Sequence, residues 1–441
     1  MLKAKKTRHQ GSEVGGQTFR NSLFAIRNPQ FAISHTPSAT SYFTLAMSIR
    51  VCHVVASVNE LTGGPAWSVT GLSEALSKQG IFTHLHTLDY RHLGPQIRPK
   101  GVTLHSYPAS FLTKYFRGVQ SKAKHGLNEL ASANLDIVHN HGLWMRPNVH
   151  ARQSANKHKL PLVISPRGML EAWSLSYSWF KKKIAWHAYE RKNLTSAAVF
   201  HATSSEEANS IRRLGFKQPI ALIHNGVDIP VLDDIPSAEL LSAKFPALAG
   251  KKWLLMLSRI HPKKGLDNLL YIWKELTVQF PDWHLVIAGP DLVGHQAELE
   301  RLVLDLKLGE HVTFTGPLSG PSKRAALGNA ELFVLPSHSE NFGIVVAESL
   351  AYSVPVVTTR ETPWMDLSSD GCGWWVGDNR RALTIALTEA MALSSQDRKK
   401  MGFKGRSLVE QKYSWNQVAE EMVTVYKWVV GGGPLPNCIQ L

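Results

Sequence analysis

Two acidic side chains, Glu340 and Glu348, are separated by seven residues in a segment that is typical of a strand, a turn and a helix. The apolar run Leu332–Leu335 predicts a buried strand, the polar residues 337–341 predict a turn, and a helix is expected to open near Phe342-Gly343. Glu340 then lies at a strand end, and Glu348 lies about 8 Å further along the helix at 1.5 Å per residue. The free N–H groups of the helix start suit a phosphate. A carboxylate, an anion site and a second carboxylate are the parts of a nucleotide-sugar site.

This segment resembles the E-x7-E element of retaining glycosyltransferases of the GT-B type, family 4 (glycosyl transferases group 1). Further segments resemble other elements of that family, and the similarity runs from about residue 47 to about residue 428. They are Gly63-Gly64-Pro65, a first glycine loop; 136–141, a histidine strand on the acceptor side; 225–228, an interdomain turn; and 257–260 with 263–265, an Arg/Lys pair that holds the donor diphosphate. A lone E-x7-E is a weak signal, whereas five elements in this order are specific.

The resemblance implies an α/β fold of the GT-B class, with two Rossmann-like, doubly wound parallel-sheet domains facing across a cleft. It also implies a hexosyltransferase-like enzyme that moves a sugar from a nucleotide-diphosphate donor to a saccharide or lipid-linked acceptor, with retention at the anomeric carbon. Members of this kind build cell-surface polysaccharides such as exopolysaccharide and lipopolysaccharide. No nucleophile for that carbon is evident in the sequence, so we favour a front-face displacement in which a donor phosphate oxygen takes the acceptor proton.

Alternating strand and helix patterns support that organisation, because a parallel sheet needs helical crossovers. The polar, basic residues 1–46 are predicted to be a disordered or spurious extension. An acceptor-binding domain is expected over 47–230, a nucleotide-sugar domain over 231–428 with its final helix crossing back to the first domain, and a tail over 429–441. Strands are predicted at 51–56, 82–88, 136–139, 162–164, 253–257, 284–288, 312–315, 332–335 and 354–358. Helices are predicted at 68–79, 122–133, 149–158, 267–279, 296–306, 322–330, 343–351 and 418–428.

The resemblance assigns roles to individual residues of this chain. Its catalytic residues would be Glu340, His141, Arg259 and Lys264; its donor-binding residues would be Gly63, Gly64, Asn341, Phe342, Gly343 and Glu348. Glu340 would bind hydroxyls of the donor sugar, Glu348 would bind the ribose, and residues 341–343 would offer backbone N–H groups. Arg167 is expected to meet an anionic acceptor such as a lipid diphosphate.

Chemistry of the residues bears on each role. Arg259 and Lys264 follow a predicted strand, and two fixed cations can neutralise a diphosphate leaving group without a metal; a solvated loop pair is the alternative. The chain has no Asp-x-Asp, so we predict neither a metal nor another cofactor. We favour His141 over His139, and zinc is not expected because no third ligand stands at metal spacing. Glu348 sits among apolar residues, so an unpaired carboxylate would be costly and a partner is implied.

Charge and aromatic content suggest where the protein acts. The chain has a net charge of +15, and residues 47–230 carry 22 Lys and Arg against 10 Asp and Glu, whereas residues 231–441 carry 21 against 23. Residues 173–186 combine aromatic side chains with three consecutive lysines, which suits an anionic membrane surface, although a solvated charge run is equally compatible. Three cysteines form no disulfide framework. A cytoplasmic enzyme is therefore expected, and the inner face of the plasma membrane is a candidate location for it.

Two other functions remain open at this point. A nucleotide-sugar epimerase of the same GT-B shape would need no acceptor. A basic, non-enzymatic nucleic-acid-binding protein would explain the charge, but no RNA-binding motif is present and the basic residues are scattered, so no nucleic-acid partner is expected.

Overall fold

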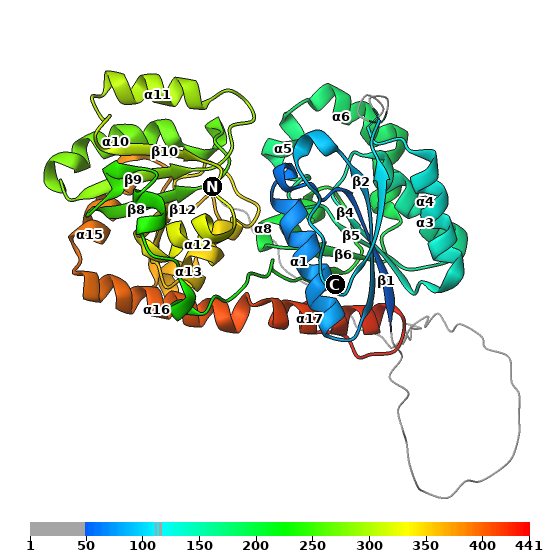
Figure 1. Ribbon diagram of the computed structural model, residues 1–441. Helices are drawn as coiled ribbons and strands as arrows, with labels where there is room; N and C mark the ends of the chain where they lie inside the picture. Colours follow the sequence, from blue (N-terminus) through cyan, green and yellow to red (C-terminus); the bar gives the residue numbers. More distant parts are fainter. Residues whose placement is uncertain (1–48, 111–112, 114–116) are drawn as a thin grey trace, which may run out of the picture. The chain divides into compact units, whose positions relative to one another are not determined.

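The computed structural model describes residues 49–110, 113 and 117–441, and the predicted extension over 1–46 lies outside them. Residues from 49 onward belong to one compact unit that contains two separate sheets. Within the described residues, no helix combines the length and the apolar character needed to cross a bilayer. The two sheets, each with helices on both faces, are seen in Figure 1.

The first sheet has the strand order β14-β7-β6-β5-β4-β1-β2-β3. Its members are β1 (Arg50–Ser57), β2 (Phe82–Asp89), β3 (Thr103–Pro108), β4 (Ile137–His141), β5 (Leu162–Ser165), β6 (Val199–Ala202), β7 (Ile220–Leu222) and β14 (Ile439–Gln440). All pairs are parallel except β14 with β7. Residues 429–441, expected to be a tail, thus contain an edge strand of the first sheet.

The second sheet has the order β10-β9-β8-β11-β12-β13 and is parallel throughout. Its strands are β8 (Lys252–Leu257), β9 (Trp283–Ala288), β10 (Val312–Gly316), β11 (Ala330–Leu335), β12 (Val356–Thr359) and β13 (Gly373–Val376). Because β8 and β11 are neighbours, the loops that follow them open at the same edge of the sheet. The predicted α/β fold with two doubly wound parallel sheets is confirmed.

Helices cover both faces of each sheet. Beside the first sheet lie α1 (Gly64–Lys78), α3 (Ser121–Asn134), α4 (Arg146–His158), α5 (Ala172–Ser176), α6 (Trp179–Ala185), α7 (Arg191–Thr195), α8 (Ser205–Arg213) and α17 (Trp415–Val429). With the second sheet are α9 (Glu239–Ser242), α10 (Leu266–Gln279), α11 (Gln296–Asp305), α12 (Gly320–Asn329), α13 (Ile344–Ala351), α14 (Asp366–Ser369), α15 (Arg380–Ala392) and α16 (Ser395–Lys412).

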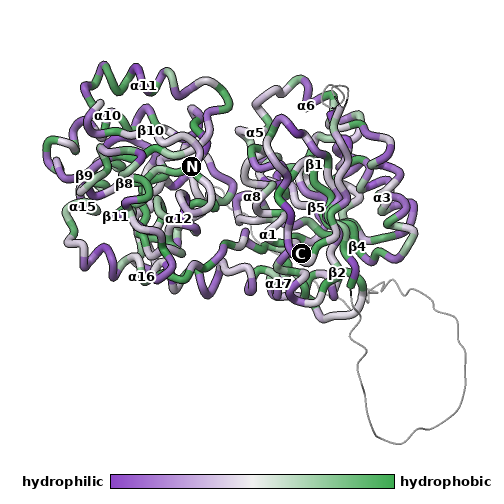
Figure 2. The backbone as a smooth tube through the Cα atoms, viewed as in Figure 1, coloured by the Kyte–Doolittle hydropathy of each residue, from purple (hydrophilic) through white to green (hydrophobic). Residues whose placement is uncertain are grey.

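Alternate residues of each strand point to opposite faces, so each sheet has two cores. In the first sheet, one core joins the strands to α3, α4 and α8, and the other joins them to α1 and α17. In the second sheet, one core contains α12, α13 and α16, and the other contains α10, α11 and α15. Figure 2 shows the hydrophobic colour concentrated in the strands, while helices such as α3 and α16 are largely hydrophilic in colour. Helix α17, last of the helices, therefore belongs to the core of the first sheet.

Several elements were not predicted. Strands β3, β6, β7 and β13 are three to six residues long, which gives the alternation of apolar residues little room to show. Helix α16 contains Gly402 and Gly405, which are poor helix formers. A Cβ on Gly402 would lie 1.8 Å from the carbonyl oxygen of Ser353, so glycine is required there for the close packing of the chain. Helix α1 begins at Gly64, four residues before the predicted start.

Candidate active site

A cavity of about 400 Å³ is lined by loops that follow strands of both sheets. Nine of the eleven predicted site residues line it: Gly63, Gly64, Arg167, Arg259, Lys264, Glu340, Asn341, Phe342 and Gly343. The two others, His141 and Glu348, lie elsewhere. Parallel sheets bind ligands at the carboxyl ends of their strands, and this cavity has that position.

Lys264 and Glu340 form an ion pair at the floor of the cavity. Lys264 ends a short turn after β8, and Glu340 lies in the loop after the neighbouring strand β11. Ser337 Oγ also donates to Glu340 Oε1 at 3.0 Å. Burial alone would raise the pKa of Glu340, but the Lys264 and Lys263 cations and the Ser337 hydroxyl outweigh it and lower that pKa. Glu340 is therefore a fixed anion whose direction is set by Lys264.

Arg259 is the exposed cation of the cavity. It follows β8, and it has no carboxylate partner within the described residues. Gly63 adopts φ 100°, and a Cβ there would lie 3.8 Å from the Arg259 side chain. The glycine loop of the first sheet thus comes close to the guanidinium without a side chain between them. An anion entering here would meet a free positive charge.

The start of helix α13 forms another side of the cavity. Gly343 adopts φ 72°, a left-handed conformation that favours glycine, and α13 begins directly after it. The side chains before it are used inside the protein: Asn341 Nδ2 donates to Thr203 Oγ1 at 2.8 Å, and buried Phe342 packs on Trp364 and Tyr413. Asn341 therefore holds the second sheet's loop against the first sheet's, in addition to the backbone role predicted for it.

Glu348 lies in a neighbouring cavity of about 430 Å³ that shares Ile344 with the first one. Lys323 of α12 provides the partner that its apolar surroundings implied, with Nζ 2.7 Å from Oε1. Among the described residues, the other oxygen, Oε2, is buried and has no hydrogen-bond partner. Glu348 lines this adjoining cavity and not the one lined by Arg259, Lys264 and Glu340, because it lies further along α13.

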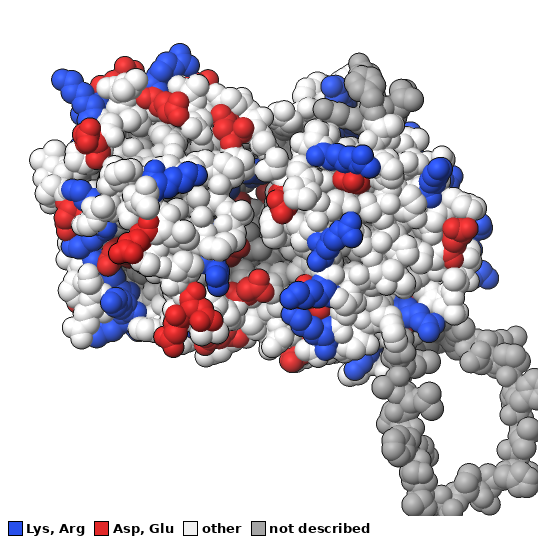
Figure 3. Space-filling model, in the orientation of Figure 1, with Lys and Arg blue, Asp and Glu red and all other residues white. Residues whose placement is uncertain are grey.

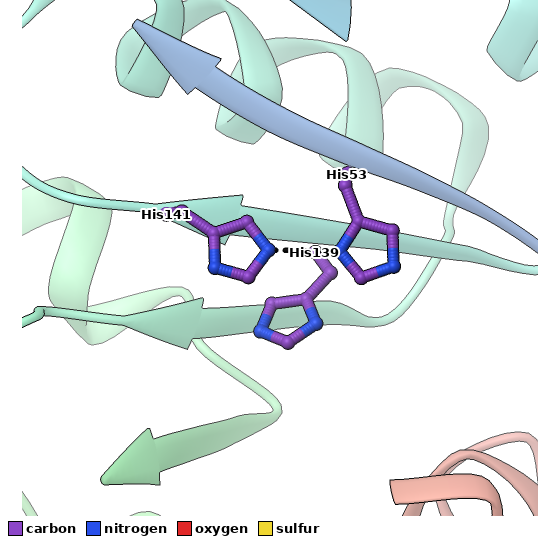
Figure 4. A group of neighbouring side chains, drawn as sticks. All are labelled: His53, His139 and His141. Carbon is purple, nitrogen blue, oxygen red and sulfur yellow. Dashed lines mark hydrogen bonds between the residues drawn. The ribbon is translucent and has the colours of Figure 1, made fainter. Parts of the chain in front are cut away.

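His141 is almost fully buried and lies beside His53 and His139 (Figure 4). Arg167 donates to His141 Nδ1 at 3.1 Å, and His141 Nε2 lies 2.8 Å from His53 Nδ1. Since a guanidinium only donates, Nδ1 of His141 accepts and its proton is on Nε2. That proton is donated to His53, whose own proton is then on Nε2, a buried atom without a partner. His141 therefore orients Arg167 and does not line the cavity.

A second chain of hydrogen bonds fixes His139. His201 Nε2 donates to the Ile223 carbonyl at 2.9 Å, so its Nδ1 accepts from Ser165 Oγ at 2.8 Å. Ser165 then accepts from His139 Nε2 at 2.7 Å, and His139 Nδ1 accepts from the Tyr426 hydroxyl at 2.6 Å. The donor and acceptor of each hydrogen bond in this chain are fixed because the Ile223 carbonyl at its end can only accept. Tyr426 belongs to α17, so the last helix orders a histidine of β4.

Burial keeps all four of these histidines neutral. Desolvation lowers the pKa of His53 and of His201 to about 3, with the Arg167 cation as a further cause. The pKa values of His139 and His141 are lowered well below the usual range, first by burial and then by neighbouring histidines and Arg167.

The fold brings a third histidine beside His139 and His141. His53, His139 and His141 have ring nitrogens within 4.8 Å of one another. His53 comes from β1, and the sheet register pairs it directly with His139 of β4, which no spacing along the chain reveals. Their nitrogens, however, bond to each other, to Ser165, to Tyr426 and to the Arg167 cation, whose charge would repel a metal ion. The group fits a hydrogen-bonded network better than a metal site.

Arg167 has φ 58°, and its NH1 group donates to Asn225 Oδ1 at 2.6 Å. Burial lowers the pKa of Arg167 to about 10, which leaves it charged at neutral pH. The next residue, Gly168, donates its N–H to Glu207 Oε1 at 2.6 Å, and a Cβ on it would lie 2.8 Å from Asn341 Cβ. The turn is thus held on both sides, and Arg167 points its charge along the cavity wall.

Three further residues have roles that the sequence did not indicate. Lys323 holds Glu348, Lys263 lies over the Trp173 ring at 4.6 Å, and Glu171 lines the cavity from the first sheet. Lys323 was detectable only as the partner that Glu348 required. No residue pattern marks Glu171, because its position depends on the fold of the loop after β5.

Comparison with known proteins gives two family matches. Residues 62–230 match the family described as Glycosyltransferase Family 4, and residues 238–408 match the family described as Glycosyl transferases group 1. The chain is 23% identical over 303 residues to GDP-mannose:cellobiosyl-diphosphopolyprenol alpha-mannosyltransferase of Xanthomonas campestris, which covers 68% of this chain and 76% of that protein.

Solved structures share the fold. Sucrose-phosphate synthase from Thermosynechococcus elongatus superposes with a TM-score of 0.69 at 19% identity, over 86% of this chain and 99% of that chain. HepE of Anabaena, in complex with UDP and glucose, superposes with a TM-score of 0.67 at 16% identity, over 86% of this chain and all of that one. The two family matches and the two-sheet fold agree, and the protein is a glycosyltransferase of the GT-B type.

Proposed function

We propose that this glycosyltransferase moves a hexose from a nucleotide-diphosphate donor to a lipid-linked or saccharide acceptor, with retention, in the synthesis of a cell-surface polysaccharide. The observation that carries the proposal is the cavity in which unpaired Arg259, the start of α13 and the Lys264–Glu340 pair converge. A pyrophosphate needs cations and N–H donors, and a hexose needs fixed hydrogen-bond acceptors; this cavity supplies both.

In the proposed complex, Arg259, Lys264 and the first amides of α13 neutralise the diphosphate as it leaves. Preorganised charges of this kind stabilise a transition state without the cost of reorienting solvent. Glu340 accepts hydrogen bonds from sugar hydroxyls, and Oε2 of Glu348 accepts from the ribose. Because these groups suffice for charge balance, the transfer is expected to be metal-independent and to continue at full rate in EDTA.

Retention is proposed on the resemblance and on the state of the carboxylates. Glu340 is bonded to Lys264 and Ser337, which makes it a weak nucleophile for a covalent intermediate. In a front-face displacement, the acceptor oxygen bonds to the anomeric carbon as the bond from that carbon to the diphosphate breaks. The electron pair of the broken bond stays on the diphosphate, and the acceptor proton passes to a phosphate oxygen.

A lipid-linked acceptor is supported by the similarity to the Xanthomonas enzyme, whose name gives a diphosphopolyprenol acceptor. Arg167 lines the cavity, and in this proposal its cation meets an anionic group of such an acceptor. A saccharide without a lipid remains compatible with the cavity, because the sugar end of both acceptors would enter in the same way.

The surface of α5 and α6 supports contact with an anionic membrane. We define the aromatic–lysine surface as Trp173, Tyr177, Trp179, Phe180, Ile184, Lys181, Lys182 and Lys183. Its five large apolar side chains are 47% to 69% exposed and account for five of the 22 exposed large apolar side chains of the described chain. Trp173 belongs both to this surface and to the cavity lining, so a bound bilayer would lie beside the cavity entrance.

Charge over the first sheet favours the same partner. Lys183 Nζ lies over the Trp179 ring at 5.9 Å, which places a cation beside the apolar groups. On the face shown in Figure 3, Lys and Arg outnumber acids over the first-sheet part, whereas both signs are mixed over the second-sheet part. Basic residues beside aromatic ones are the usual pattern of a peripheral membrane surface.

Thermal shift with UDP-, GDP- and ADP-hexoses tests the proposal, because a ligand that binds the native state raises its apparent stability. The donor that gives a shift is then incubated with and without acceptor extracts, and the product linkage is determined by NMR. A retained anomeric configuration is expected. An inverted linkage would refute retention, and an isomerised donor in the absence of acceptor would indicate an epimerase instead.

A further inference from the structure

Glu171 is the second carboxylate that lines the cavity, and it lies on the wall formed by the first sheet. It ends the loop after β5 and directly precedes α5, with an extended backbone. Glu340 lies in the loop after β11 of the second sheet. Glu340 carries the donor-side role proposed above, whereas the proposed mechanism uses Glu171 for nothing.

The Glu171 carboxylate has no hydrogen-bond donor within the described part of the chain, and its Oε1 atom is buried. The position beside Gly168 explains why there is room for it: a Cβ on Gly168 would lie 3.1 Å from Glu171 Oε1 and 2.8 Å from Asn341 Cβ. Asn341 Oδ1 is also buried and lacks a partner. Two hydrogen-bond acceptors thus flank one glycine without a donor.

Buried acceptors that lack donors cost free energy, so their persistence at a cavity wall points to a ligand that brings donors. Burial raises the pKa of Glu171 to about 7, partly offset by the Lys263 cation and reinforced by Glu207 and Glu340. Lys263 is itself held over the Trp173 ring, next to α5. The cost of burying the Glu171 carboxylate is thus poorly offset until a ligand donates hydrogen bonds to it.

We propose that Glu171 binds the acceptor through two neighbouring hydroxyls of one sugar ring, so that the acceptor end recognised by the enzyme is a saccharide. This rests on the proposed glycosyl transfer. A carboxylate has two oxygens and only accepts, which matches a pair of adjacent hydroxyls. Glu171 takes no proton in the reaction; it positions the sugar whose third hydroxyl attacks. A non-sugar lipid phosphate would be repelled by the same carboxylate.

The test uses methyl hexosides and their single deoxy analogues as acceptors, with the donor found by thermal shift. Removing either bonded hydroxyl should lower kcat/KM for wild type at least tenfold. Glu171→Gln should lower kcat/KM for the parent methyl hexoside by a similar factor, and the change should be larger in KM than in kcat. For this variant, kcat/KM should be nearly the same for the parent acceptor and for the two deoxy analogues. Glu171→Asp should recover part of the loss. Glu275→Gln, at an exposed position of α10, is the matched control and should behave as wild type.

Two further measurements, the pH dependence of kcat/KM and the affinity for nucleoside diphosphate, distinguish a failure of this proposal from a failure of the proposed function. For wild type, kcat/KM for the acceptor should rise with pH through about 7, because the carboxylate form accepts both bonds, and Glu171→Gln should show no such rise. Nucleoside diphosphate affinity should be equal in both. Unchanged acceptor kinetics in Glu171→Gln, full deoxy penalties in that variant, or no binding of any methyl hexoside to the enzyme with UDP or GDP would overturn the Glu171 proposal. Failure of every nucleotide sugar to bind wild type would instead refute the proposed function.

Discussion

The Nζ atom of Lys323 lies 2.7 Å from Oε1 of Glu348, while Oε2 of the same carboxylate is buried and has no partner in the described part of the chain. One oxygen thus orients the side chain, and the other can still accept a hydrogen bond. This arrangement connects α12 and α13, which lie on the same face of the second sheet.

Replacing Glu348 by Gln should weaken nucleoside diphosphate binding. A hydrogen bond to a charged group contributes roughly 1.5–3 kcal/mol, so the dissociation constant should rise about tenfold to 150-fold. Lys323→Met should have a smaller effect of the same sign, because it removes the orienting partner only. Isothermal titration calorimetry with UDP and GDP measures both. If Glu348→Gln binds as tightly as wild type, Glu348 has no part in donor binding.

Replacing Glu340 by Ala should abolish transfer and also destabilise the protein. It leaves Lys264 without its carboxylate in a site where the two side chains are only 11% and 14% exposed, and such a loss costs roughly 3 kcal/mol. The double variant Glu340→Gln with Lys264→Met should regain most of the unfolding free energy but none of the activity. Urea unfolding and donor turnover, measured on the same samples, separate the two effects. Recovery of activity in the double variant would contradict the role of the pair in catalysis.

Stability should fall as the pH drops below about 6.5. The pKa values of His53, His139, His141 and His201 are lowered in the folded protein, so these groups stabilise the fold above the unfolded pKa of about 6.5 and lose that contribution as the pH falls. Each histidine adds at most about 1.4 kcal/mol per pH unit in that window.

The variant that tests this prediction is His201→Gln, which keeps a polar side chain but removes one titrating group. Its unfolding free energy should depend less steeply on pH between 6 and 4 than that of wild type. Exposed His125, paired with Glu129 on α3, offers a matched His→Gln variant that should leave the slope unchanged. Equal slopes for wild type and His201→Gln would mean that the network is protonated in the folded state.

The aromatic–lysine surface should bind anionic vesicles. Wild type should sediment with phosphatidylglycerol vesicles at low salt. The triple variant Trp179→Ser, Phe180→Ser and Ile184→Ser should bind these vesicles much more weakly. The double variant Lys181→Gln and Lys183→Gln should weaken the free energy of binding to these vesicles by about 2 kcal/mol in total, and added salt should remove this difference from wild type.

The control variant for vesicle binding is Val278→Ser with Leu304→Ser, because these side chains are 83% and 72% exposed on α10 and α11. It should bind as wild type does. Equal loss of binding in this control, or equal binding to neutral and anionic vesicles, would show that exposed apolar area alone drives the association. Transfer to a free saccharide should be unaffected in all variants.

Segments with strong local signals were predictable. Strand β11 and helix α13 lie within two residues of their expected bounds, because an apolar run of strand length ends at a polar turn and Gly343 marks the helix start. The same signals located Glu340 and Glu348. Arg259 and Lys264 were placed correctly because they follow β8, and the carboxyl ends of parallel strands meet at one edge.

Contacts that depend on strand order were not predictable. His53 meets His139 only because β1 lies beside β4 in the sheet, and that neighbour relation is absent from any spacing along the chain. Gly168 lies close to Asn341 because loops of the two sheets meet at the cavity, a relation between sheets that spacing along the chain does not reveal either. The burial of His141 was missed because it follows from the position of β4 between β1 and β5 in the sheet.

Helix α17 and strand β14 complete the first sheet from the far end of the chain, and Tyr426 bonds to His139 in its centre. During synthesis, the strands that begin with β1 therefore leave the ribosome hundreds of residues before the segment that covers their core and orders their histidines. The first sheet cannot reach its final state until α17 and β14 have been synthesised. A stop between Glu348 and Trp415 would leave the cavity-lining loops of both sheets encoded, but one face of the first sheet would lack α17.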